Sequence, residues 1–171
     1  MAVERAGTER RLAGAVTAIL AALEALAAIG LIVAFFMAWF RSTDPSGGAA
    51  PPGWAGPYDY AWSDWHPDHV DAAVLLTALA PYVAVATALL RVVMRGPNTR
   101  YLLAIVFAGA VAGSVLAYGE IVSLSLPAGT TGLPVTGFWL FLGAAIVGLA
   151  ASAADSAIAI RRARTVESPS D

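Results

Sequence analysis

Three acidic residues lie inside long runs of apolar residues, where an ionisable side chain is costly and therefore informative. Glu24 lies in the first of four such runs, Glu120 in the third and Asp155 in the fourth. Ionisable groups within membrane spans are rare and usually face a bundle interior or a water-filled path. The three carboxyls could therefore form a proton or cation relay. Alternatively, they could be structural groups that hydrogen-bond to neighbouring helices.

Small residues share a helical face with these acids. Glu120 follows Gly109 and Gly113 at helical spacing, and Asp155 follows Gly148 in the same way. Small residues allow helix backbones to approach closely, so we expect these three glycines to lie at helix-packing seams and the acids to point inward.

The depth of the acids bears on how they are neutralised. Glu24 and Asp155 are expected near one membrane boundary and Glu120 near the other. No Lys, Arg or His falls within the expected spans, although Arg162 lies one heptad beyond Asp155 and could serve as its counter-ion at the interface. Structural carboxyls of this kind should tolerate replacement by the corresponding amides.

A second group of polar residues lies between the first two runs. Asp64, His66 and His69 belong to the aromatic segment 54–71 and are weak candidates for a Zn or Cu site. An N-cap at Asp68, just before an apolar run, would explain the acids here without a metal, so no metal site is favoured.

The chain lacks the residues and motifs that most kinds of enzymatic catalysis require. There is no cysteine, and we find no phosphate-binding loop, dinucleotide fingerprint, nucleophile elbow or zinc-protease motif. No histidine lies in a span to bind haem iron. The net charge of −2 argues against a nucleic-acid partner. The sequence therefore predicts a protein without enzymatic activity and without a cofactor.

Composition indicates the environment of the chain. Of 171 residues, 58% are hydrophobic and only 13% are charged, and the mean hydropathy is +0.71. So few polar groups cannot cover the surface of a soluble domain, so the sequence predicts an integral membrane protein. The absence of lysine and the abundance of alanine are typical of a high-GC bacterium.

The four apolar runs are each long enough to cross about 30 Å of hydrocarbon as a helix. We expect an all-α protein, an up-down bundle of four transmembrane helices forming a single domain. An aromatic extracytoplasmic loop over 41–69 would join the first two helices, and 161–171 would form a cytoplasmic tail. The expected spans are 12–40, 70–90, 101–126 and 136–160.

The arginines predict the orientation of the bundle. In a topology with four membrane spans, nine of the ten basic residues fall on one side of the membrane, and only Arg41 falls on the other. The positive-inside rule therefore places both termini in the cytoplasm, with the protein in the cytoplasmic membrane.

These observations favour a non-catalytic accessory or scaffolding subunit of a membrane complex, with the lipid bilayer, other membrane proteins or further copies of the chain as partners. One alternative is a small proton- or cation-coupled transporter that uses Glu24, Glu120 and Asp155. A single Glu in the first of four helices is similar to the small multidrug-resistance exporters, but those proteins are shorter and have tight loops. Another alternative is an extracytoplasmic metal or ligand sensor that acts through the 54–71 segment.

Overall fold

The apolar runs form four long helices in the computed structural model, which describes residues 2–37, 39–42, 54–55, 72–94, 97–123 and 132–167. By length and composition all four could cross a membrane, with candidate spans of 25, 19, 22 and 27 residues. Three short strands accompany them. The elements are α1 (Ala2–Phe35), β1 (Phe40–Ser42), β2 (Trp54–Ala55), α3 (Ala72–Met94), α4 (Pro97–Ser123), β3 (Gly132–Pro134) and α5 (Thr136–Glu167).

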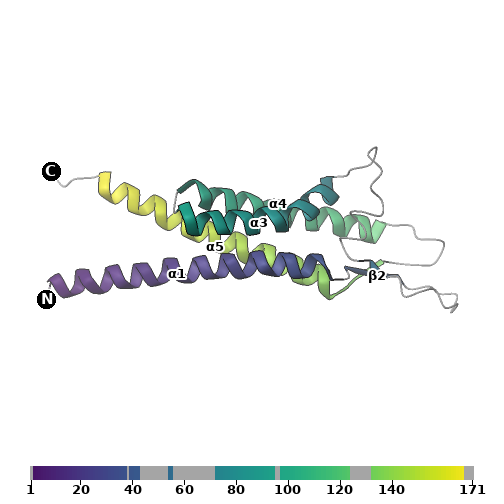
Figure 1. Cartoon of the computed structure of the whole chain (residues 1–171), viewed down its shortest axis with the longest axis horizontal. Coiled ribbons are helices and arrows are strands. Elements are labelled where there is room, and N and C mark those ends of the chain that lie inside the picture. The colour runs from purple at the N-terminus through teal and green to yellow at the C-terminus, as the bar shows by residue number, and fades with distance from the viewer. Residues whose placement is uncertain are drawn as a thin grey trace.

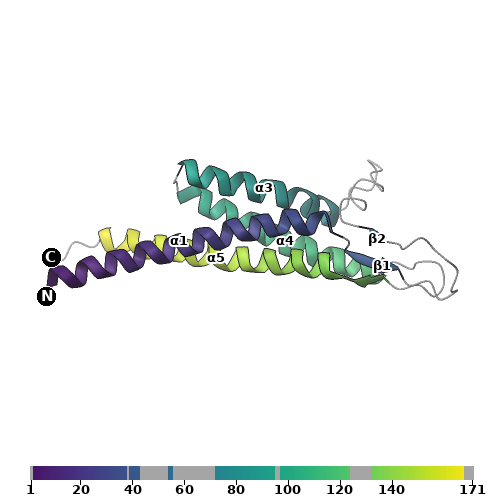
Figure 2. The same ribbon diagram turned by 60° about the horizontal axis from the view of Figure 1, so that its bottom comes forward.

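The helices lie lengthwise against one another. Helix α1 packs against α5 and less extensively against α3, while α4 packs against both α3 and α5. Figures 1 and 2 show that α1 begins and α5 ends at the same end of the molecule, where α3 also ends and α4 begins. We call this the α3–α4 end. Both α1 and α5 extend well past the ends of α3 and α4 there.

Small and aromatic side chains fill the interior, and large aliphatic side chains face outward. Phe107 and Phe141 are fully buried, whereas Leu26, Ile105 and Val93 are 64%, 67% and 81% exposed. A water-soluble bundle would bury such aliphatic residues, because their exposure to water is unfavourable. The outer surface is therefore suited to contact with lipid chains.

Glycines set the closest approaches between helices. A Cβ atom built on Gly113 of α4 would lie 2.8 Å from Cβ of Leu76 in α3. The ring of Phe107 in α4 packs against Gly148 of α5, and a Cβ atom built on this glycine would overlap that ring. Gly109 is less crowded, since its added Cβ would meet the nearest Leu76 atom at an ordinary 3.6 Å.

A small antiparallel sheet closes the opposite end, with strand order β2-β1-β3. The first helix ends at Phe35, earlier than the expected limit at residue 40, because the chain turns and enters β1. Trp39 then folds back: its Nε1–H donates a 2.9 Å hydrogen bond to the carbonyl of Ala34. Its ring also packs on Phe141, at a centroid distance of 4.7 Å.

Candidate functional site

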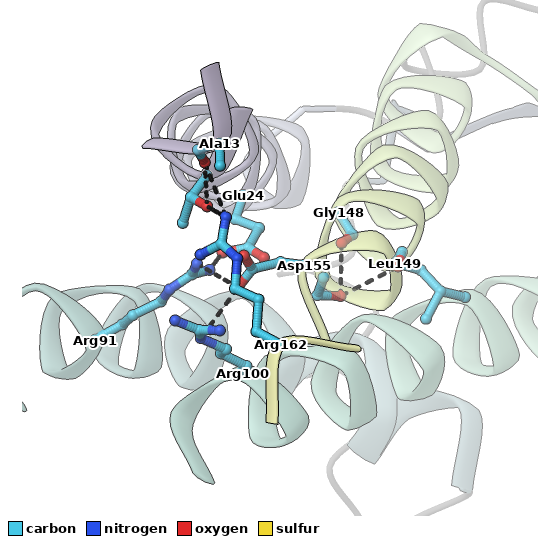
Figure 3. A network of polar contacts seen from close by, with 10 residues as sticks. Ala13, Glu24, Arg91, Arg100, Gly148, Leu149, Asp155 and Arg162 are labelled. Carbon is cyan, nitrogen blue, oxygen red and sulfur yellow. Dashed lines mark hydrogen bonds and ion pairs between the residues drawn. The ribbon is translucent and has the colours of Figure 1, made fainter. Parts of the chain in front are cut away.

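Four charged side chains, one from each long helix, meet inside the bundle near the α3–α4 end (Figure 3). Arg91 of α3 forms ion pairs with Glu24 of α1 and with Asp155 of α5, the latter at 2.7 Å from Nη2 to Oδ2. Arg100 of α4 approaches the same Oδ2 atom through Nε at 3.2 Å. We call these four residues the acid–arginine cluster.

The two acids of the cluster are inaccessible to solvent, whereas the two arginines reach them from the surface. The side chains of Glu24 and Asp155 are 1% and 0% exposed, and those of Arg91 and Arg100 are 12% and 24% exposed. Arg91 lies three residues before the end of α3, and Arg100 lies in the first turn of α4. Long, flexible stems allow arginines at helix ends to extend their charged groups toward a partner at another depth.

The depth of the cluster follows from helix geometry. Asp155 is nineteen residues after Thr136, the first residue of α5, which corresponds to about 28 Å along the helix axis. This is close to the ~30 Å thickness of a bilayer's hydrocarbon core. If the hydrocarbon begins near Thr136, the cluster therefore lies at the opposite boundary.

The arrangement compensates buried charge. An isolated carboxylate in an apolar interior is very unfavourable, and removal of one partner from a buried ion pair is strongly destabilising. Here a single guanidinium, with donors on two separate nitrogens, bridges two carboxylates on different helices. The cluster therefore ties α1, α3, α4 and α5 together.

A cavity of about 670 Å³ lies beside the cluster. Glu24, Arg91, Arg100 and Arg162 contribute its charged groups, and the rest of its wall is small and mostly apolar. Oε1 of Glu24 is buried and has no hydrogen-bond partner among the described residues. A cavity with charged groups and an unpaired acceptor in its wall can accommodate water or a polar ligand.

The predicted site residues are only partly brought together. Glu24 and Asp155 meet through Arg91, while Glu120 falls in α4 with its side chain outside those described. Arg162, the expected partner of Asp155, donates from Nη2 to the carbonyl of Ala13 at 3.1 Å. The observed partners of Asp155 are the two arginines of the cluster.

The sequence interpretation missed Arg91 and Arg100. Arg91 lies one residue after the expected span 70–90, and Arg100 lies one residue before the expected span 101–126. Both were therefore assigned to the connection, and Glu24 was left without a counter-ion. The sequence did contain an indication of this pairing. Arg91 and Arg100 flank the expected spans on the same side of the membrane to which Glu24 and Asp155 lie closer.

The candidate metal-site residues Asp64, His66 and His69 lie outside the described residues. Within the residues that were described, no group of three or more His, Cys, Asp or Glu side chains could hold a metal ion.

No protein-family model and no curated protein sequence matches the chain. Its function must therefore be inferred from its own residues and their geometry.

Proposed function

We propose that the protein is a non-catalytic accessory or scaffolding subunit of a membrane complex, built as an up-down bundle of four membrane-spanning helices with an aromatic outer loop. The observation that carries this proposal is the pairing of both buried acids with arginines. Charges held in this way stabilise the assembly of four helices, and they are poorly suited to a proton relay.

The same arginines support a cytoplasmic location for the α3–α4 end. Arg91, Arg100 and Arg162 lie around the cavity at this end, and Arg11 is exposed on the part of α1 that extends toward it. Positively charged residues near the ends of membrane spans favour the cytoplasmic side. Both termini would accordingly lie in the cytoplasm of the cell that makes the protein, in its cytoplasmic membrane.

The experiment is affinity purification in mild detergent followed by quantitative mass spectrometry of co-purifying proteins. The matched control is an unrelated four-span membrane protein with the same tag and a similar expression level. An accessory subunit should enrich at least one other membrane protein in a fixed ratio. Isolation as a monomer, with nothing enriched over the control, would contradict the proposal.

The second candidate is a small proton- or cation-coupled transporter, and the cavity beside Glu24 is the observation that favours it. Its wall contains a buried carboxylate with one unpaired oxygen, a feature of ion and substrate pathways in membrane proteins. This function requires that Glu24 exchange its arginine partner for a proton or cation during a cycle, so that loss of the carboxylate abolishes transport.

A further inference from the structure

The cavity beside the acid–arginine cluster has properties that the accessory function does not use. It lies between α1 and α3 and is elongated along α1, because its lining extends from Gly14 to Ala25. These residues are eleven steps apart, or about 16 Å along a helix. Its lining residues are Gly14, Thr17, Ala18, Ala21, Glu24, Ala25, Ala88, Arg91, Val92, Arg100 and Arg162.

Arginines outnumber carboxylates among the lining residues of the cavity. Three arginines and one carboxylate, that of Glu24, line it, and Asp155 pairs with two of those arginines. Arg91 is committed to both acids. Arg100 is paired through Nε alone, and its two terminal nitrogens make no hydrogen bond or ion pair within the described part of the chain. Those nitrogens provide a fork that suits the oxygens of a phosphate group.

The position of the cavity restricts the source of such a phosphate. If the hydrocarbon core begins near Thr136, the cavity lies near the depth where that core ends, given the distance from Thr136 to Asp155. Gly14, Ala18 and Ala25 on α1 and Val92 on α3 are all exposed members of its lining. The cavity is therefore open at the side of the bundle, between two helices, and its wall is apolar around the opening. The acyl chains of a bound lipid can extend through such an opening into the bilayer. A soluble phosphate compound has no acyl chains and would not need an opening on this side.

We propose that this cavity binds the headgroup of an anionic phospholipid, with the phosphate on Arg100 and the acyl chains along the alanine-rich wall of α1. Arg162 contributes positive charge at the outer part of the site while it remains bonded to Ala13. The arginines of the lining attract an anionic headgroup. The inference rests on the proposed membrane embedding, but it requires no protein partner.

The experiment measures lipid retention by native mass spectrometry. Purified full-length protein is stripped of lipid in detergent and titrated with phosphatidylglycerol, with phosphatidylcholine or with inorganic phosphate. One phosphatidylglycerol should bind per chain. Arg100→Gln should weaken that binding about tenfold or more, because a charged hydrogen-bonding group is lost. The control is Arg161→Gln, which changes the net charge equally on an exposed residue of α5 that does not line the cavity.

A second variant guards against misfolding of Arg100→Gln, whose side chain also contacts Asp155. Ala18→Phe fills the cavity from α1 without removing a charge, and it should also expel the lipid. The proposal is overturned if Arg161→Gln lowers retention as much as the cavity variants, or if phosphatidylcholine binds as well as phosphatidylglycerol. It is also overturned if inorganic phosphate binds the wild type with the same dependence on Arg100, which would identify a soluble phosphate as the ligand. Failure to find a protein partner would leave these results unchanged.

Discussion

Replacement of Arg91 by Gln tests whether the acid–arginine cluster stabilises the bundle. Gln removes the cation that pairs with Glu24 and Asp155. Asp155 retains Arg100 at 3.2 Å, so the main cost is that Glu24 becomes a buried carboxylate without a counter-ion. Loss of one partner from a buried ion pair costs about 3–5 kcal/mol. Because Arg91 is 12% exposed and water can reach it, we expect the lower limit, about 3 kcal/mol.

The structure also predicts a rescue. If the unpaired carboxylate of Glu24 causes the loss, then Arg91→Gln combined with Glu24→Gln should recover about 2 kcal/mol, because no uncompensated charge remains on α1. The assay is unfolding in mixed micelles with increasing sodium dodecyl sulfate, followed by circular dichroism. Wild type, both single variants and the double variant complete a double-mutant cycle.

Arg161→Gln is the control for loss of one positive charge, since Arg161 is exposed on α5, and it should unfold like the wild type. Two outcomes would refute the reasoning. One is an Arg91→Gln variant that is as stable as the control. The other is a double variant that loses the sum of the two single losses, which would mean that Glu24 and Arg91 do not interact.

Three further predictions concern packing, topology and the outer loop. Gly148→Ala should cost about 1–3 kcal/mol, because its Cβ would overlap Phe107. The control is Gly143→Ala, which should be neutral or stabilising because an added Cβ there has no atom within 4 Å. Equal thermal stability of the two variants would contradict the close contact between Gly148 and Phe107. Reporter fusions should indicate the outside near Gly48 and the cytoplasm after Arg164; a cytoplasmic signal near Gly48 would exclude four spans. Elemental analysis should find no stoichiometric Zn or Cu, and about one ion per chain, lost when both loop histidines become Gln, would instead support the sensor.

The long helices could be predicted because apolar length alone requires them in a membrane. Among the residues that the structure describes, four helices are long and apolar enough to span it. Helix α1 ends at Phe35, before the expected limit at residue 40. Hydrophobicity does not distinguish the last turn of a helix from the buried Trp39 and the strand that follow it.

The sequence places the arginines and the two acids on the same side of the membrane, but it does not show which arginine pairs with which acid. Arg91 is 67 residues from Glu24 and 64 from Asp155, and their meeting depends on the relative depth of three helices. That depth is set by close contacts such as the one between Gly30 and Ala144, where an added Cβ would lie 3.1 Å from its neighbour. Sequence spacing within one helix gives a face, but it does not give the register between helices.

The most direct test of the central claim is proton flux through the purified protein in liposomes that contain a pH-sensitive dye. A pH gradient is applied while valinomycin and potassium hold the membrane potential at zero. If Glu24 and Asp155 serve as paired structural charges, wild-type liposomes should show no more flux than protein-free liposomes. Flux in the wild type that disappears in Glu24→Gln, with helical content unchanged by circular dichroism, would contradict the account and identify a proton-coupled transporter.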